Sequence, residues 1–135
     1  MILLDTNVVI GIVNNRSPRL RAEFERRLAS GEHIWLSSIV IFELKYGIAK
    51  SRRQHANETV LRGFMLAPLS PLPFDEEDAA QSAGLRAILE TAGTPIGPYD
   101  VLIAGQSLRH GATLVTANTR EFARVPGLNV EDWAK

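Results

Sequence analysis

Short apolar runs alternate with amphipathic helical segments along the whole chain, and this alternation constrains the fold more than any other feature. Residues 1–4, 33–36 and 112–116 are apolar runs too short for helices, and they suit strands buried on both faces. Residues 19–29 carry Leu, Phe and Leu at four-residue spacing against Arg and Glu, which is typical of an amphipathic helix. The pattern predicts an α/β fold with a parallel sheet and right-handed crossovers.

The rest of the chain extends this pattern. Further helices are predicted over residues 8–13, 39–50, 57–66 and 75–91, and from about residue 98. Residues 69–74 lie among prolines and suit either a short third strand or an extended connector, and residues 128–130 suit an edge strand. At 135 residues and 45% hydrophobic, the chain can bury one core and has no room for a second. We therefore expect one α/β domain over residues 1–135, with a central parallel sheet of four or five short strands flanked by helices.

The amino-acid composition and the apolar segments indicate the cellular compartment that we expect for the protein. The chain has no cysteine, which excludes disulfides and thiolate metal sites and suits a reducing compartment. The apolar amino terminus lacks a basic region and is interrupted by Asp5, so it does not have the form of a secretory signal. No apolar run approaches the roughly 20 residues that cross a bilayer. A cytoplasmic protein without a membrane partner is the expectation.

Charge is balanced overall but unevenly distributed. Basic and acidic residues number fifteen each, yet the chain through Arg62 holds ten basic and six acidic residues and the remainder holds five and nine. The distribution fits either a basic face that binds nucleic acid or an ordinary mixed surface. The densest basic segment contains Lys45, Lys50, Arg52 and Arg53. It is interpreted either as a solvated helix end or as a surface that contacts phosphates.

Acidic side chains stand where apolar strands end or apolar helices begin. Asp5 directly follows the first apolar run, Asp100 precedes an apolar helical segment, and a turn holding Asn118 and Glu121 follows residues 112–116. The carboxyl ends of parallel strands meet at one edge of a sheet, so we expect these side chains to lie close together. Each also has a purely structural interpretation: Asp5 and Asp100 can cap helices, and Asn118 with Glu121 has the form of a capping box.

Glu43 is a fourth candidate. It lies within the predicted helix 39–50, with Ile39, Val40, Tyr46 and Gly47 on the same face. A carboxylate on an apolar helix face is costly unless it is paired, protonated or bound to a cation. The alternative is a buried Glu that is satisfied by a backbone amide or by an arginine.

Several carboxylates in one pocket cannot all stay ionised without a counter-charge. A hard divalent cation supplies that charge, and oxygen ligands without cysteine favour Mg²⁺ or Mn²⁺. Such a site polarises a phosphoryl oxygen and lowers the pKa of a bound water, as phosphodiester hydrolysis requires. Rival chemistries lack their motifs, because the chain has no Walker loop, GxGxxG, HExxH or GxSxG.

Four segments resemble, in order, the four signatures of PIN-domain ribonucleases, and most of all those of the VapC-type toxins of bacterial toxin–antitoxin pairs. The segments are residues 3–7 (LLDTN), 38–47 (SIVIFELKYG), 96–104 (IGPYDVLIA) and 116–122 (TANTREF). They extend over essentially the whole chain. Each motif alone is weak, whereas the four together are highly specific.

The resemblance implies roles for individual residues. The acids that match those holding the metal and activating water are Asp5, Glu43 and Asp100. The fourth catalytic position varies among PIN domains, and this chain offers Asn118 or the nearby Glu121. The small polar residues implied to orient the acids are Thr6, Asn7 and Thr116. The candidate RNA contacts are Lys45, Lys50, Arg52 and Arg53.

The resemblance also implies an activity and partners. The expected protein is a Mg²⁺- or Mn²⁺-dependent endoribonuclease that cleaves structured RNA, in particular tRNA. Its expected partner is a VapB-type antitoxin, with a homodimeric toxin that joins it in a hetero-oligomer. The alternative is a catalytically silent PIN-like interaction module whose acids only cap helices. A receiver-like domain phosphorylated on Asp5 is disfavoured, because no lysine is convincingly placed to support it.

Overall fold

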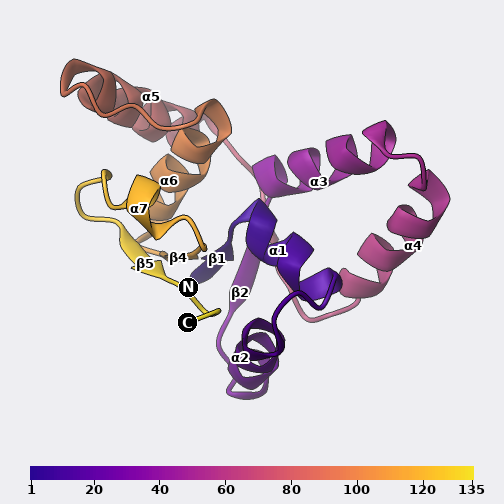
Figure 1. The fold of residues 1–135 in the computed structure, drawn as a ribbon. Helices are drawn as coiled ribbons and strands as arrows, with labels where there is room; N and C mark the ends of the chain where they lie inside the picture. The colour runs from indigo at the N-terminus through magenta and orange to yellow at the C-terminus, as the bar shows by residue number, and fades with distance from the viewer.

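A five-stranded parallel sheet forms the centre of the computed structural model, which describes residues 1–135 (Figure 1). The strand order is β3-β2-β1-β4-β5, and every neighbouring pair is parallel. The strands are β1 (Ile2–Leu4), β2 (Ile34–Ser37), β3 (Ser70–Leu72), β4 (Thr113–Val115) and β5 (Asn129–Glu131). The predicted α/β class and parallel sheet are confirmed, and the proline-flanked segment is a strand at the edge of the sheet.

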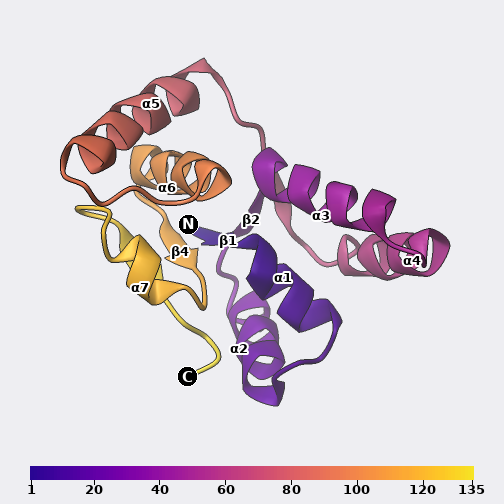
Figure 2. The same cartoon turned by 45° about the horizontal axis from the view of Figure 1, so that its top comes forward.

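Seven helices cover the sheet. They are α1 (Thr6–Val13), α2 (Pro18–Ala29), α3 (Ser38–Lys50), α4 (Gln54–Phe64), α5 (Glu76–Thr91), α6 (Pro98–His110) and α7 (Thr119–Phe122). Helices α1 to α4 lie on one side of the sheet and α5 to α7 on the other (Figures 1 and 2). No helix is both long enough and apolar enough to span a membrane.

The first strand is the centre of both the sheet and the core. Its residues pair with β2 on one side and with β4 on the other, with Leu3 opposite Trp35 and Leu4 opposite Val115. Leu3 and Leu4 are completely buried. An apolar run of this kind suits a central strand because both of its faces are covered by helices.

The strand order reverses at β1, and this reversal positions the site. The chain moves outward from β1 through β2 to β3, then crosses back to β4 and β5 on the other side of β1. Helices α1 to α4 and helices α5 to α7 therefore lie on opposite faces of the sheet, and the two groups of helices diverge at the carboxyl ends of β1 and β4. In open α/β sheets, ligands bind in the crevice at such a switch point.

Two helices begin two or three residues earlier than predicted, and α4 also ends at Phe64 rather than residue 66. Helix α1 begins at Thr6 rather than Val8, because Asp5 is its cap and accepts a hydrogen bond from the Thr6 N–H group. Helix α4 begins at Gln54 rather than residue 57 and follows Arg53, whose side chain makes no capping hydrogen bond. Without a capping side chain, the sequence holds no signal that marks this start.

Candidate active site

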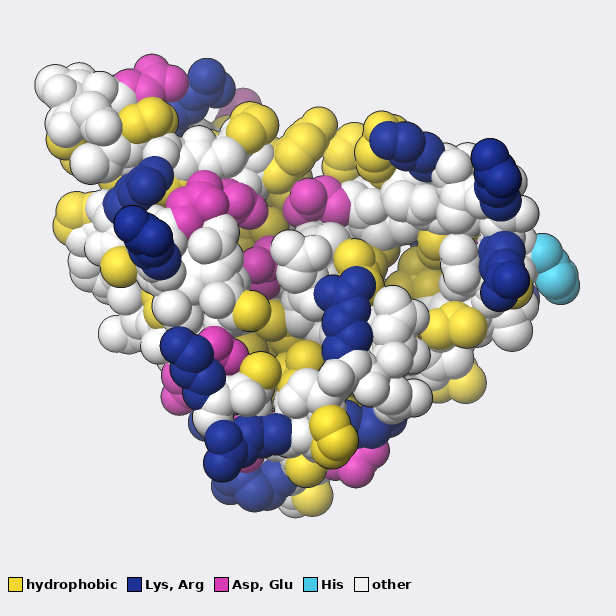
Figure 3. Space-filling view, viewed as in Figure 1, with side chains coloured by type: hydrophobic (Ala, Val, Ile, Leu, Met, Phe, Trp, Pro, Cys, Tyr) yellow, Lys and Arg dark blue, Asp and Glu magenta, His cyan; other side chains and the backbone are white.

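Acidic side chains from four segments meet at the carboxyl edge of the sheet. Asp5 follows β1, Glu43 lies on α3, Asp100 is in the first turn of α6, and Glu121 is on α7. In Figure 3 acidic side chains gather where these helices converge around α1. The structure therefore brings together the acids that the sequence distributes over more than a hundred residues.

Asp5 is the most rigidly held of the four. Its side chain is buried, and its backbone N–H donates to the carbonyl of Val115 in β4 (2.9 Å). Its Oδ1 accepts from the Thr6 N–H (2.7 Å), and its Oδ2 accepts from the Thr116 hydroxyl (2.8 Å). Burial raises the pKa of Asp5, and the hydrogen bonds from Thr116 and Thr6 oppose that rise.

Thr6 connects Asp5 to Glu43. Its N–H group donates to Asp5, while its hydroxyl donates to Oε1 of Glu43 (2.8 Å). Glu43 is half-buried, so the carboxylate is held at the rim of the pocket by a hydrogen bond and not by a basic side chain. Asn7, the third small polar residue, is exposed and makes no side-chain hydrogen bond, so the structure does not place it among the groups that hold the acids.

Glu121 is held by the two segments beside it. Its Oε1 accepts from the Gly97 N–H (2.7 Å), and its Oε2 accepts from Nδ2 of Asn118 (2.6 Å). These bonds lower the pKa of Glu121. The Asn118 side chain makes no capping bond to the α7 backbone, so the capping-box interpretation is wrong. Of the two candidates for the fourth position, Glu121 is the acid at the site, and Asn118 orients it.

Asp100 has the most perturbed carboxyl group of the site. Its pKa is raised to about 6 by burial first, then by the charges of Asp5, Glu121 and Glu43, and by a hydrogen bond with Glu121. The space around it is tight, since a Cβ atom added at Gly97 would lie 2.9 Å from Oδ2 of Asp100. The site therefore disfavours the ionised form of Asp100 more than an exposed position would.

The contacts form one continuous network. It runs from Glu43 through Thr6 to Asp5, and from Asp5 through Thr116 to the Asn118 N–H group, which donates to the Thr116 hydroxyl oxygen (3.0 Å). The Asn118 side chain then continues it to Glu121, which contacts Asp100. None of the ion pairs of the chain includes any of the four acids of this network.

The residues of the network fit a hard divalent cation. The acids of the network offer carboxylate oxygens, their mutual repulsion contributes to the raised pKa of Asp100, and none of them forms an ion pair with a basic side chain. The arrangement is not a preformed ligand set, because no three acidic or histidine side chains are grouped as ligands of one ion. Asp5, Glu43 and Asp100 are the residues that could hold a cation.

The predicted RNA contacts lie along α3 and beyond its end. Lys45 pairs with Glu58 of α4 (3.2 Å), and Nζ of Lys50 lies 5.9 Å from the centre of the Tyr46 ring. Lys50 is seven residues past Glu43, which is about 10 Å along a helix axis. Arg52 and Arg53 follow the last turn of α3. The basic segment therefore extends away from the acids on one side and does not surround them.

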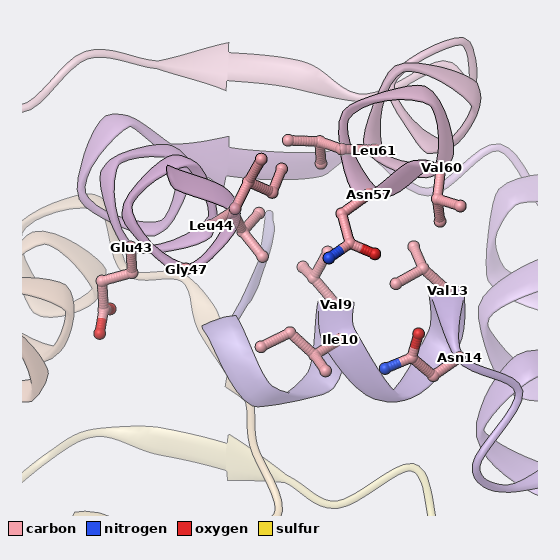
Figure 4. Close-up of a pocket in the computed structure, with 11 residues that line it drawn as sticks. Val9, Ile10, Val13, Asn14, Glu43, Leu44, Gly47, Asn57, Val60 and Leu61 are labelled. Carbon is pink, nitrogen blue, oxygen red and sulfur yellow. The ribbon is translucent and has the colours of Figure 1, made fainter. Parts of the chain in front are cut away.

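An apolar cavity opens beside Glu43. It lies between α1, α3 and α4, has a volume of about 250 Å³, and is lined mainly by apolar side chains (Figure 4). The carboxylate of Glu43 lies at one end of the cavity and points away from its apolar lining. The cavity is therefore a neighbour of the acidic network and not part of it.

Gly97 is the contributor that the sequence patterns did not identify. Its N–H group holds Glu121, and the absence of a side chain leaves room for Asp100. The signal available in the sequence is Gly97 directly before Pro98, where α6 begins. Its hydrogen-bond partner lies 24 residues away, which no local pattern indicates.

Comparison with known proteins agrees with this geometry. The sequence matches the PIN domain family over residues 2–128. It is 39% identical over 131 residues to the "tRNA(fMet)-specific endonuclease VapC" of Salmonella typhimurium, covering 97% of this chain and 96% of that protein. It is 38% identical over 133 residues to "Ribonuclease VapC2" of Rickettsia felis, covering 98% of each.

Solved structures show the same fold. The structure superposes with a TM-score of 0.90 on a chain of the crystal structure of VapBC2 from Rickettsia felis bound to a DNA fragment from its promoter, at 36% identity, covering 98% of this chain and 99% of that one. The TM-score is 0.89 for DNA-bound VapBC from Salmonella typhimurium, at 39% identity and 98% and 97% coverage. The chain belongs to the PIN-domain family and, within it, to the VapC ribonucleases.

Proposed function

We propose that this protein is the toxin of a toxin–antitoxin pair and acts as a Mg²⁺- or Mn²⁺-dependent endoribonuclease. The observation that carries the proposal is the network of Asp5, Glu43, Asp100 and Glu121, which gathers carboxylates that make no ion pair with a basic side chain. Carboxylates crowded in this way need a cation to stay ionised together. The VapC relatives named as ribonucleases support the same activity.

In this proposal some side chains bind the cation, and others hold the cation-binding carboxylates in place. Asp5, Glu43 and Asp100 supply the oxygens that bind it, and Asp100, whose pKa is about 6, binds it in the ionised form. When bound, the cation would polarise a phosphoryl oxygen and lower the pKa of a bound water. Thr6 and Thr116 keep Asp5 and Glu43 in place through their hydroxyl hydrogen bonds.

The proposed substrate is tRNA. Relatives at 39% identity over nearly their whole length are named as tRNA(fMet)-specific endonucleases. The acidic pocket lies at the carboxyl edge of the sheet, so a single-stranded loop could enter it. Base-paired RNA is instead a regular helix, and proteins recognise it mostly by its shape. Sequencing of RNA ends after expression would identify the cleaved RNA and the bond.

The proposed protein partners are a VapB-type antitoxin and a second copy of this chain. Crystal structures of relatives contain VapBC complexes. The apolar cavity beside Glu43 supports an antitoxin segment that covers Ile10, Val13 and Val60 and brings its flanking residues to the acids. A separate exposed aromatic patch, in which the Phe42 ring contacts both neighbouring tyrosine rings, supports a homodimer.

The activity is tested by RNA cleavage. Purified protein should cut RNA with Mg²⁺ or Mn²⁺ and stop when a chelator is added. Asp5→Asn and Asp100→Asn should abolish cleavage while leaving the circular dichroism spectrum unchanged. The matched control is Glu76→Gln, an exposed acid on α5 without an ion pair, which should cut at the wild-type rate. Full activity in a folded Asp100→Asn protein would contradict the proposal.

The silent interaction module is distinguished by metal binding. It predicts that calorimetry detects no Mn²⁺ binding to the wild-type protein and that RNA remains intact. The nuclease predicts binding that is lost in the Asp5→Asn protein. The continuous hydrogen-bonded network favours the nuclease. Glu43 is in the middle of α3 and is connected to Asp5 through Thr6, and helix capping alone would not explain this connection.

A further inference from the structure

Two arginines beside the acidic network have no acidic partner. Arg120 precedes Glu121 on α7, is exposed, and takes part in no side-chain hydrogen bond or ion pair. Arg124 follows one turn later and donates only to the backbone carbonyl of Pro95 (2.8 Å). Arg27 and Arg109 are paired with acids, whereas the other arginines without an ion pair, Arg16, Arg19, Arg52, Arg53 and Arg62, belong to the first half of the chain. The charges of this pair are therefore available to a ligand.

The two arginines lie at the rim of the acidic pocket. The charge of Arg124 contributes to the lowered pKa of Glu121, which shows that the two groups are near each other. The turns continue from α7 through Ala123 and Arg124, since their N–H groups bond to Thr119 and Glu121, and residues four apart on such turns face the same way. Figure 3 shows basic side chains over α7 immediately beside the gathered acids.

Basic side chains flank the acidic pocket on two sides. The basic segment along α3 lies on the side of Glu43, and the arginines of α7 lie on the side of Glu121. A bound cation offsets the repulsion between the carboxylates and a single phosphate, but the flanking phosphates of an RNA strand still approach a negatively charged pocket. They need a positive charge on each side.

We propose that Arg120 and Arg124 bind the phosphates of the RNA strand on the α7 side of the pocket, so that the strand crosses the acids from α7 towards α3. This inference rests on the proposed nuclease function. An arginine guanidinium matches phosphate geometry with paired N–H donors. Protein interfaces require an apolar centre as well, and α7 itself carries none of the exposed large hydrophobic side chains of the chain. The surface therefore fits a polyanion better than it fits a protein.

The test is the kinetics of cleavage of a fluorescent single-stranded oligoribonucleotide with Mg²⁺. Arg120→Gln should raise KM by roughly three- to tenfold, the range for one charge-assisted contact at an exposed site, and change kcat less than about twofold. Each lost phosphate contact should also reduce the slope of log(kcat/KM) against log salt concentration by about 0.7. Arg120→Lys, which keeps the charge, should recover most of the salt dependence.

Two controls separate contact with RNA from structural damage. Arg86→Gln removes one exposed charge from α5, where Arg86 pairs only with Glu90, and should leave KM and the salt slope unchanged. The melting temperature should be unchanged in Arg120→Gln. Arg124→Gln should show the same KM effect, and any loss of its bond to the Pro95 carbonyl would appear as a lower melting temperature.

The outcomes are distinct. An unchanged KM and salt slope in Arg120→Gln, with a wild-type enzyme that cuts RNA, would overturn the inference and leave the nuclease proposal intact. So would a fall in kcat at constant KM, which would mean that Arg120 acts only by positioning Glu121. Antitoxin affinity that falls in Arg120→Gln while RNA kinetics stay the same would assign the surface to the antitoxin instead. A wild-type protein that does not cut RNA would overturn the proposed function itself.

Discussion

Replacing Asp100 by Asn should stabilise the metal-free protein. Asp100 is held among three other carboxylates, and its pKa is raised from 3.8 to about 6 by burial and by their charges. A carboxyl group whose pKa is raised on folding binds its proton more tightly in the folded state. Folding is therefore opposed wherever the group must be ionised, which is above pH 6, and the cost disappears as the pH falls towards 4.

The magnitude follows from the pKa. The rise from 3.8 to about 6 corresponds to at most about 3 kcal/mol at neutral pH. Asp100 is only half-buried, and solvent screening reduces this value to about 1 to 2 kcal/mol. For a domain of this size, that is a rise in Tm of roughly 3 to 8 °C for the Asp100→Asn protein at pH 8 without divalent ions.

The assay is thermal unfolding followed by circular dichroism, at pH 5 and pH 8, with a chelator and then with Mn²⁺. The gain of Asp100→Asn over wild type should have its full value at pH 8 and about half of it at pH 5. Mn²⁺ should stabilise the wild-type protein and not the variant, because the variant lacks a ligand. The control Glu76→Gln removes an exposed acid and should not raise the Tm. An unchanged or lower Tm for metal-free Asp100→Asn at pH 8 would refute the crowding of the acids.

Three further predictions concern the groups around the acids. Thr6→Val keeps the size of the side chain but removes the hydroxyl that holds Glu43. Mn²⁺ affinity measured by calorimetry should therefore fall by roughly 10- to 100-fold, and Thr6→Ser should restore it. Gly97→Ala places a Cβ 2.9 Å from Asp100, so cleavage should slow by about tenfold or more while the protein still folds, and wild-type activity would show that the contact is relieved without consequence. The cleavage rate should rise between pH 5 and pH 7 as Asp100 ionises. A higher Mn²⁺ concentration should move the midpoint of this rise to lower pH, because the cation competes with the proton. A flat pH profile over this range would exclude Asp100 as the titrating ligand.

The sequence predicts the parts of this structure that depend on local patterns. The run before Asp5 is short and wholly apolar, and such a run has few alternatives to a buried central strand. Once the sheet is parallel, the position of Asp5 and of the turn after β4 at the same edge follows from chain direction alone. The fold class and the meeting of the acids were therefore predictable before any coordinates.

Other features depend on distances that no local pattern encodes. The side chain of Asn118 could cap α7 or hold Glu121, and both use the same three-residue spacing, so only the structure distinguishes them. The role of Gly97 depends on α7 packing against the turn before α6. The basic residues after α3 are adjacent to Glu43 in sequence but not in space, because a helix carries each successive residue away along its axis.

The pairing of β1 with β4 also sets when the site can first exist during synthesis. Asp5 emerges from the ribosome early, but the hydroxyl that fixes its Oδ2 belongs to Thr116, and the neighbouring carboxylate of Glu121 comes later still. A nascent or truncated chain that ends before residue 113 therefore lacks the strand beside β1 and cannot assemble the network. The network can therefore form only after both Thr116 and Glu121 have been translated.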